Sequence, residues 1–520
     1  RCSRDWSSDV CSSDLLLNMV LIDILEESRK NKKLSTGILL KNIFADNWSK
    51  TFLFDSTADK SFSYKEFFTL VIKYSEKLQK LGLQKNDKVC LLLPNSVDLI
   101  ALYFACLITR LVAVPIDPEK NTNEVNEILS YTNYKVIVND DPTSLRTTNI
   151  EDFHNHILQN KVNINELEIF NTLNYDDLFL ITFTSGTTGI PKGVMHSFNN
   201  LMLSASAFTK KFNFNENNIF YHNLPMSYIA GILNLIILPF ISQSKIVLGK
   251  RFAISSMLNF WDVPMRYNVN TFWFIPTILS LLLKLDRGEL GVSYARNTKI
   301  IGCVGTAPLN HSTKLAIEKK YGISLYESYG LSETLFVSTN SPDNNDENST
   351  GQLLDDVKLT LSEDDEILIN TPWMFLGYVN LEKNLYFKDG SYTSGDIGQI
   401  DQNNFLTITG RKKDLIIKGG INISPKRIEN FIDEFGAFNE HTILGFDDQI
   451  MGEKIVCFFV LGTTSFNDDM KKKLNSAIIS KLGKDYGIDQ FVEIDEIPMN
   501  ADRKSTRLNS SHGYISYAVF

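Results

Sequence analysis

Short apolar runs alternate with amphipathic stretches along the first third of the chain. The runs Lys88–Leu93, Leu111–Ile116 and Tyr134–Val138 are typical of buried strands. Between them, Val97–Ile108 and Asn123–Ser130 have the spacing of helices. Strands that alternate with helices in this way predict a mainly parallel sheet with helices on its faces.

The alternation continues further along the chain and then changes. Helices are expected at Asn199–Phe212, at Asp468–Leu482 and from Ile421–Pro425 through Phe435. Strands are expected at Leu178–Phe183, Phe220–Pro225, Lys245–Gly249, Thr271–Phe274, Lys299–Val304, Glu366–Asn370, Phe405–Thr409, His441–Gly445, Lys454–Leu461 and Phe491–Ile494. The last of these elements predict a compact α+β unit at the carboxyl-terminal end, and Glu151–Asn174 is expected to be a polar connector.

Length and charge narrow the classes of function. The chain has 520 residues, which far exceeds one typical domain. Its formal net charge is -9 and it contains no basic block, which argues against nucleic acid as the main partner. The most apolar stretch, Tyr228–Phe240, contains Asn234 and is shorter than the ~20 residues of a spanning helix. We therefore expect a soluble enzyme without a transmembrane segment.

The cysteines indicate a reducing compartment. Outside the first residues the chain has four, and none is in Cys-x-x-Cys spacing: Cys90, Cys106, Cys303 and Cys457. Scattered cysteines of this kind favour the cytoplasm over a disulfide framework or a zinc site.

The two ends of the chain do not read as native protein sequence. Asp502–His512 can be back-translated into a DNA whose reverse complement, in another frame, encodes Asp5–Asp14. The two tails therefore resemble opposite strands of one sequencing-library adapter, and we expect residues 1–15 and 502–520 to be artefacts. The native segment is expected to run from about Leu16 to Ala501, with Met19 a plausible start.

A run of glycines and hydroxyls directly follows the strand expected at Leu178–Phe183. Within Thr182–Gly193, the hydroxyl residues are Thr184, Ser185, Thr187 and Thr188, and the glycines are Gly186, Gly189 and Gly193. Backbone N–H groups and hydroxyls that converge in this way suit an oligophosphate, and Lys192 adds a cation. The alternative is an ordinary surface turn. The run does not have the P-loop pattern, in which Gly-Lys is followed directly by Ser or Thr.

The order and spacing of this run closely resemble the phosphate loop of the adenylate-forming superfamily. That superfamily comprises acyl-CoA synthetases, aryl-CoA ligases, luciferases and peptide-synthetase adenylation domains. The resemblance covers nearly all of Met19–Ala501. It implies a large AMP-binding domain over 19–410 and a small, mobile α+β lid over 411–501, whose end is truncated.

A second motif, Leu325–Thr334, agrees with the resemblance. Tyr329 offers a flat face for adenine, and Ser332 offers a hydroxyl for phosphate. Glu333 is a hard oxygen ligand suited to Mg²⁺, although a lone Glu after a turn is usually a helix cap. The resemblance implies that this run contacts the nucleotide through Glu327, Ser328, Tyr329, Gly330 and Ser332.

Two further loops are expected beside the nucleotide. Gly305, Thr306 and Ala307 follow a strand end, where α/β sheets bind ligands, and the related enzymes pack this loop along adenine. The alternative is a tight turn that needs small residues. Asp396 could accept hydrogen bonds from both ribose hydroxyls, or it could be a turn aspartate.

The junction with the lid carries the next candidates. In the related enzymes Arg411 would meet ribose or phosphate, and Lys413 would be the hinge. Gly419 and Gly420 would let a loop approach the pantetheine arm of CoA. The alternative for Arg411–Asp414 is a solvated turn.

The acid-binding wall is the least defined part of the site. After Pro225, relatives commonly have a histidine where this chain has Tyr228. Tyr228 and Gly231 are expected either to line the substrate pocket or to pack in the core. No aspartate stands nearby to hold a substrate ammonium, which argues mildly against amino acids.

The resemblance implies ATP-dependent activation of a fatty or aryl acid to acyl-AMP, then transfer to CoA. Lys192, Glu333 and Arg411 would be catalytic, with Glu333 on the metal, and ATP, Mg²⁺ and CoA would be required. Relatives use a second lysine near the carboxyl end. Lys504 is in register, but Arg503 replaces the glycine before it and the residue is adapter-like, so it receives no role. Loading of a carrier protein and non-catalytic binding of nucleotide remain alternatives.

Overall fold

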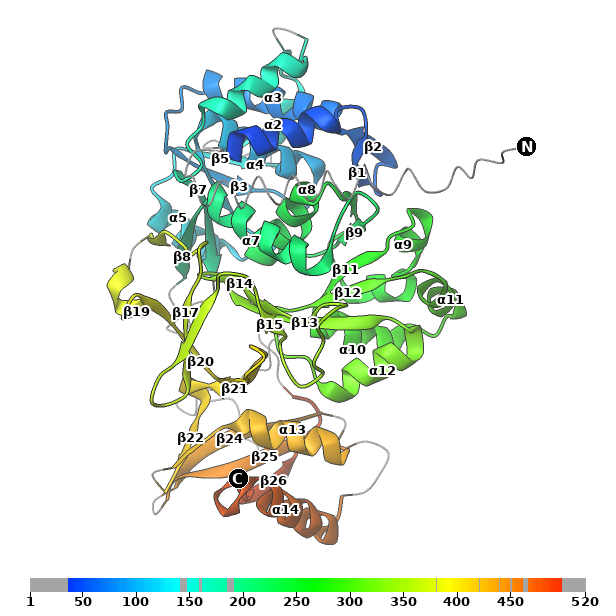
Figure 1. Cartoon of the computed structure of the whole chain (residues 1–520), viewed down its shortest axis with the longest axis vertical. Helices are drawn as coiled ribbons and strands as arrows, with labels where there is room; N and C mark the ends of the chain where they lie inside the picture. Colours follow the sequence, from blue (N-terminus) through cyan, green and yellow to red (C-terminus); the bar gives the residue numbers. More distant parts are fainter. Residues whose placement is uncertain are drawn as a thin grey trace, which may run out of the picture.

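The structure is a computed structural model that divides into a large body and a smaller one at the carboxyl-terminal end (Figure 1). It describes residues 36–140, 147–158, 161–184, 191–379, 381–419, 421–438, 440–448, 451–461 and 466–497.

The largest sheet has nine strands in the order β15-β14-β13-β12-β11-β9-β10-β1-β2. The six strands from β13 to β1 are parallel, and the strands at both edges are antiparallel. The strands are β1 (Thr51–Asp55), β2 (Lys60–Ser63), β9 (Ile219–His222), β10 (Lys245–Leu248), β11 (Thr271–Phe274), β12 (Ile301–Val304), β13 (Ser324–Leu331), β14 (Leu335–Thr339) and β15 (Gln352–Leu353).

A second sheet has seven strands in the order β18-β8-β7-β4-β3-β5-β6. It is parallel from β7 to β6, whereas β8 is antiparallel to both of its neighbours. The strands are β3 (Lys88–Leu92), β4 (Val112–Pro115), β5 (Val136–Asn139), β6 (Thr147–Asn149), β7 (Leu178–Thr184), β8 (Lys192–Ser197) and β18 (Gly377–Tyr378).

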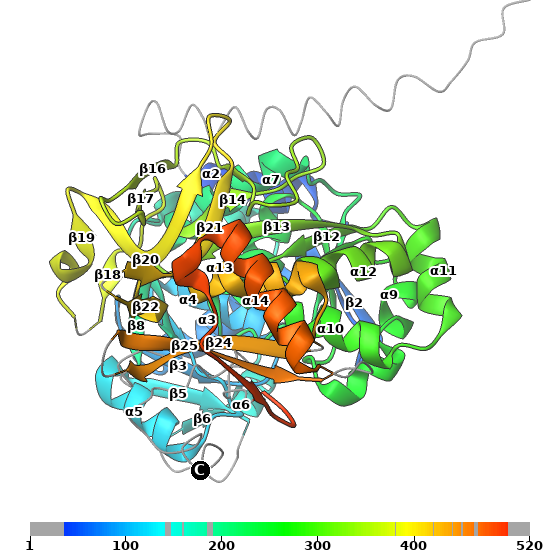
Figure 2. The ribbon, with the colours of Figure 1, turned by 90° about the horizontal axis from the view of Figure 1, so that it is seen from below.

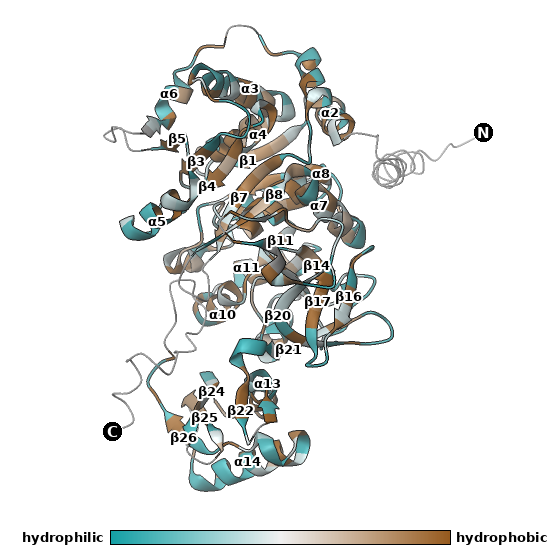
Figure 3. Cartoon of the chain, turned by 90° about the vertical axis from the view of Figure 1, so that its left-hand side faces the viewer, coloured by the Kyte–Doolittle hydropathy of each residue, from teal (hydrophilic) through white to brown (hydrophobic). Residues whose placement is uncertain are grey.

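Helices surround these two sheets and share one apolar core with them. In α4 every residue from Val97 to Ile108 except Asp98 is buried, so this helix lies inside the body. Figure 3 shows the hydrophobic strands gathered in the interior. The helices are α2 (Thr36–Asp46), α3 (Tyr64–Lys80), α4 (Val97–Thr109), α5 (Thr122–Thr132), α6 (Ile150–His154), η1 (Ile164–Thr172), α7 (Phe198–Phe212), η2 (Ala230–Ile237), α8 (Leu238–Ile241), η3 (Ile254–Asn259), α9 (Asp262–Arg266), α10 (Pro276–Leu285), α11 (Glu289–Asn297) and α12 (His311–Tyr321).

A third, antiparallel sheet has the order β16-β17-β20-β19, with β21 on the other side of β20. Its elements are β16 (Lys358–Leu361), β17 (Glu366–Asn370), η4 (Lys383–Tyr386), β19 (Phe387–Lys388), β20 (Ser391–Ile400) and β21 (Leu406–Arg411). The short helix η5 (Lys412–Asp414) then leads out of this sheet.

The smaller body follows η5 and has an apolar core made of residues from Ile416 onward. Two helices cover one face of its sheet, as the view from below shows (Figure 2). The elements are β22 (Ile416–Lys418), β23 (Ile421–Ile423), α13 (Pro425–Phe435), β24 (Glu440–Asp448), β25 (Gly452–Val460), α14 (Asp468–Leu482), η6 (Lys484–Tyr486) and β26 (Gln490–Glu493).

The predicted fold class is confirmed, with local differences. The sequence did not predict β8, nor the helical turns within Glu151–Asn174, where Leu167 and Phe170 anchor η1 in the core. The apolar stretch Tyr228–Phe240 is mostly η2 and α8. Among the described residues, no helix has the length and apolar character needed to cross a membrane.

Candidate functional site

The predicted phosphate loop connects two antiparallel strands. Thr184 at the end of β7 stands opposite Lys192 at the start of β8, so the two flanks of the loop meet. The Lys192 ammonium lies 4.4 Å from the ring centroid of Tyr386 and 5.6 Å from that of Tyr378. Five predicted phosphate contacts lie outside the described residues: Ser185, Gly186, Thr187, Thr188 and Gly189.

The candidate metal ligand is held by a tyrosine from another sheet. Glu333 is only 9% exposed, and Tyr378 Oη donates to its Oε1 over 2.7 Å. The same hydroxyl lies 3.1 Å from Tyr392 Oη. One buried carboxylate suits Mg²⁺, which binds through few carboxylates together with substrate phosphates.

A tight turn and a buried histidine position this carboxylate. A side chain at Gly330 would lie 2.1 Å from the Leu335 carbonyl oxygen, so the β13–β14 turn needs glycine there. His196 Nε2 donates to the Ser332 carbonyl oxygen over 2.7 Å. Burial lowers the pKa of His196 to about 4, so the imidazole is neutral at ordinary pH. β8 is thereby tied to the residue before Glu333.

The predicted ribose carboxylate forms a second polar cluster. Asp396 is 3% exposed, and it accepts a hydrogen bond from Tyr329 Oη over 2.7 Å. Arg411 Nε lies 2.9 Å from the other carboxylate oxygen, because β20 and β21 place the two residues opposite each other. Burial raises the pKa of Asp396, and the charge of Arg411 opposes that rise. The structure thus brings three predicted residues together.

The two predicted adenine loops lie side by side. β12 and β13 are parallel neighbours, with Val304 opposite Glu327, so Gly305, Thr306 and Ala307 follow directly beside Ser328. Ser328 Oγ donates to the Val304 carbonyl over 2.9 Å. Thr306 has a φ of 73°, in the left-handed region.

Glu327 faces inward from this strand. Its carboxylate pairs with Lys314 over 3.2 Å, and Lys314 is 1% exposed. Burial raises the pKa of Glu327, and the lysine opposes that rise. This pair fixes the strand next to the candidate nucleotide, which favours a supporting contact over a direct one.

The candidate acid-binding wall is only partly supported. A side chain at Gly231 would lie 2.0 Å from the Pro225 carbonyl oxygen, which favours the packing interpretation for that glycine. Tyr228 is half-buried in the residues before η2. The neighbouring Ser227 lines a cavity of about 310 Å³, whereas neither Tyr228 nor Gly231 is among its described lining residues.

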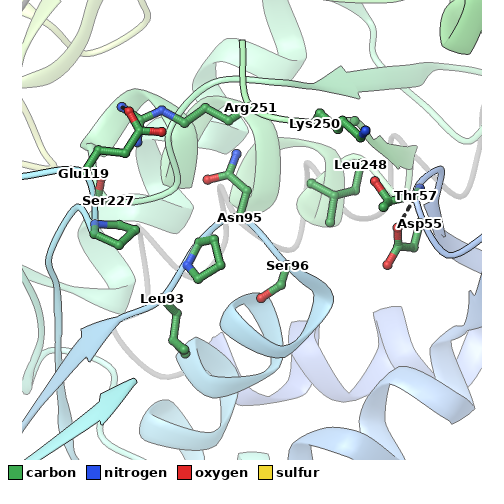
Figure 4. Close-up of a pocket in the computed structure, with 13 residues that line it drawn as sticks. Asp55, Thr57, Leu93, Asn95, Ser96, Glu119, Ser227, Leu248, Lys250 and Arg251 are labelled. Carbon is green, nitrogen blue, oxygen red and sulfur yellow. Dashed lines mark hydrogen bonds and ion pairs between the residues drawn. The ribbon is translucent and has the colours of Figure 1, made fainter. Parts of the chain in front are cut away.

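That cavity lies at the carboxyl ends of β1, β3 and β10 (Figure 4). Arg251 pairs there with Asp117 over 2.6 Å and with Glu119 over 3.3 Å. β10 and β9 are parallel neighbours, so their carboxyl ends lie at the same edge of the sheet. The cavity and Tyr228, which follows β9, therefore lie along the same edge. None of these charged residues was predicted from the sequence to lie in the site.

The predicted hinge and pantetheine residues lie at the start of the smaller body. Lys413 is in η5, between β21 and β22. Gly419 has a φ of 61° and donates its N–H to the Met451 carbonyl over 2.7 Å. Gly420 lies outside the described residues.

Three tyrosines of the site were not predicted: Tyr378, Tyr386 and Tyr392. The sequence shows them as an aromatic group just before Asp396. The link of Tyr378 to Glu333 and Lys192 depends on the pairing of β18 with β8, which no local pattern indicated.

Comparison with known proteins identifies the family of the chain. The family model described as AMP-binding enzyme matches residues 44–379. The chain belongs to the AMP-binding enzyme family. The matched range includes β7, β8, the Glu333 turn and Tyr378, and the predicted superfamily resemblance is confirmed.

Relatives in this family resemble the chain over most of its length. A 2-succinylbenzoate–CoA ligase of Listeria monocytogenes is 28% identical over 85% of this chain and 90% of its own. A medium-chain fatty-acid–CoA ligase of Escherichia coli is 24% identical over 81% and 80%. The crystal structure of ATP-bound MatB from Rhodopseudomonas palustris has a TM-score of 0.78, with 22% identity, over 90% and 96%.

Proposed function

We propose that this AMP-binding enzyme is an AMP-forming acid–thiol ligase of the acyl-CoA synthetase type. A carboxylate oxygen attacks the α-phosphorus of ATP, the bond to the β-phosphate breaks, and acyl-AMP and pyrophosphate form. The thiol of CoA then attacks the acyl carbon, and AMP leaves. The observation that carries this proposal is a chain of contacts: Tyr378 contacts both Lys192 and Glu333, and Tyr329, on the strand that leads to Glu333, donates to the Asp396 that pairs with Arg411.

The residues take separate roles in the proposal. Lys192 neutralises charge on the triphosphate, and Glu333 would hold Mg²⁺, which would lower that charge further. Asp396 binds the ribose and Arg411 meets ribose or phosphate. Tyr329 and the loop Gly305–Ala307 flank adenine. The pair that Glu327 forms with the buried Lys314 supports that strand.

The two half-reactions need different surroundings for the acyl carbon. We propose that residues 19–410 and 411–501 are two domains that reorient about Lys413 between these reactions. The separate core of the smaller body supports this division. Gly419 and Gly420 would face the pantetheine arm of CoA in one of the orientations.

We place the enzyme in the cytoplasm, where its cosubstrates are made and thiols stay reduced. This rests on the buried free thiols Cys90, Cys106, Cys303 and Cys457. The acid is a fatty or aryl acid, since two of the relatives are a medium-chain fatty-acid–CoA ligase and a 2-succinylbenzoate–CoA ligase.

The test supplies the chain with ATP, Mg²⁺, CoA and a panel of fatty and aryl acids, and detects products by mass spectrometry. An acyl-CoA that appears together with AMP supports the proposal and identifies the acid. In parallel, CoA is mixed with chemically prepared acyl adenylates, which tests the second half-reaction alone. Acyl-AMP without a thioester would indicate a carrier protein as acceptor. No product from either starting point would contradict the ligase function.

A further inference from the structure

One tyrosine lies between the two oppositely charged groups of the site. The Tyr378 hydroxyl donates to Glu333 Oε1 over 2.7 Å, while the ring of the same residue lies 5.6 Å from the Lys192 ammonium. Tyr386 adds a second ring at 4.4 Å from that ammonium. Among the ion pairs of the residues that the structure describes, none joins Lys192 to Glu333.

Tyr378 is fixed by its surroundings. β18 pairs with β8, so that Tyr378 stands opposite Val194. The preceding Phe375 donates its N–H to the Glu333 carbonyl over 2.9 Å, and the two aromatic rings lie 4.9 Å apart. Tyr378 is 4% exposed. Burial raises the pKa of its hydroxyl well above the usual value, so the hydroxyl stays a donor.

We propose that Tyr378 is a positioning residue that prepares Glu333 for the metal and Lys192 for the phosphates by keeping them apart. This role rests on the proposed function. A direct Lys–Glu pair in a buried site would satisfy both charges and would have to break when Mg²⁺ and ATP bind. A neutral hydroxyl aligns one carboxylate oxygen, and an aromatic face attracts the ammonium, without neutralising either charge.

The two halves of Tyr378 can be removed separately. Tyr378→Phe deletes the hydroxyl and keeps the ring, so the Mg²⁺ concentration for half-maximal ATP binding should rise roughly tenfold. At saturating Mg²⁺ its affinity for ATP should stay within about twofold of the parent. Tyr378→Leu also removes the ring, so its ATP affinity should fall several-fold even at saturating Mg²⁺.

The measurement is calorimetric titration of the full chain with ATP over a series of Mg²⁺ concentrations, together with the melting temperature. Tyr175→Phe is the matched control, because it removes another buried tyrosine hydroxyl, which donates to the Phe170 carbonyl over 2.7 Å. Substitutions of Tyr386 give a second pair of variants, which do not alter the hydrogen bond to Glu333. Tyr386→Leu should weaken ATP binding at saturating Mg²⁺, whereas Tyr386→Phe should not.

The proposal is overturned if Tyr378→Phe folds and keeps the Mg²⁺ dependence of the parent. It is also overturned if the Phe and Leu variants lose affinity equally and in proportion to their melting temperatures, which is what a purely structural role produces. If the Tyr378 variants do not fold, the Tyr386 variants decide. Equal ATP affinities of Tyr386→Leu and Tyr386→Phe would then overturn the proposal that aromatic rings hold Lys192 apart from Glu333. A parent that binds no ATP would instead refute the proposed function itself.

Discussion

At the scale of single residues, two buried histidines couple the stability of the protein to pH. His196 and His222 are fully buried, and burial lowers their pKa values to about 4 and about 3. In the unfolded chain each imidazole binds a proton near pH 6.5, whereas in the folded chain it does so only near its lowered pKa. Between those values the unfolded state binds more protons, so the free energy of unfolding falls as the pH falls.

We expect stability to be greatest above about pH 6.5 and to decline below it, by roughly 1 kcal/mol per pH unit for each of the two histidines. Urea denaturation at several pH values measures this slope. His196→Gln keeps a donor for the Ser332 carbonyl but does not titrate, so its slope should be about half that of the parent. An unchanged slope in this variant would show that His196 does not carry the effect.

Glu333 gives the second prediction at this scale. Glu333→Gln keeps the shape and can still accept from Tyr378, but it removes the charge that would bind Mg²⁺. We expect pyrophosphate release to fall by roughly a hundredfold or more, the range observed when one stabilising group is removed from a transition state. Glu318→Gln is the control, since Glu318 accepts the Leu325 N–H over 3.0 Å and has no proposed catalytic role. Equal rates in parent and Glu333→Gln would exclude the metal role.

At the scale of elements, local patterns predicted about half of the described strands and several long helices, but not how strands meet. β11, β17 and α14 were predicted with the bounds they have, because apolar residues dominate the strands and helical spacing marks α14. β8 was missed, since Lys192–Ser197 mixes charged, polar and apolar residues. Its strand form follows from antiparallel pairing with β7, which the sequence order does not reveal.

The same limit applies to the candidate site. Glu333, Asp396 and Arg411 stand in motifs that can be recognised along the chain, so their roles could be predicted, although these roles stay predictions. Tyr378 could not be linked to Glu333, because the two are brought together by the β8–β18 pairing of a different sheet. Contacts between distant segments therefore account for most of what the sequence did not predict.

η2 provides a prediction at the scale of elements. In Gly231→Ala, the new Cβ would lie 2.0 Å from the Pro225 carbonyl oxygen, a backbone atom that cannot move alone. We expect the free energy of unfolding to fall by roughly 1–3 kcal/mol, the cost of overpacking a core, with the preference among acids unchanged. Chemical denaturation and the acid panel measure the two quantities.

The control for this substitution is Gly288→Ala. Gly288 has a φ of -81°, and its added Cβ would meet only the Asp286 carboxylate at 3.4 Å. This variant should be as stable as the parent. If Gly231→Ala is equally stable but prefers different acids, the glycine lines the substrate pocket and the packing interpretation is wrong.

At the scale of the whole molecule, a short connection joins two separately packed bodies. The core of the smaller body contains residues from Ile416 onward, while the core around α4 ends at Trp373. Between β21 and β22 the chain is η5, whose three residues, Lys412–Asp414, are not buried. Because the connection itself is not buried, turning the smaller body about it would break contacts such as the Lys284–Glu440 pair but would leave both cores packed, which is why we expect rotation rather than unfolding.

Lys413→Pro tests this rotation. Proline fixes φ near -65° and also restricts the residue before it, so the substitution should hold the connection between the two bodies in a narrow range of conformations. One half-reaction should then proceed at close to the parental rate, and the other should slow by roughly tenfold or more. Pyrophosphate release and thioester formation from a prepared acyl adenylate measure the two halves separately.

Lys413→Ala removes the same charge and leaves φ unrestricted, so it should slow neither half selectively. If both variants slow both halves to the same extent, the lysine side chain and not the rotation is what matters, and the two bodies work in a single orientation.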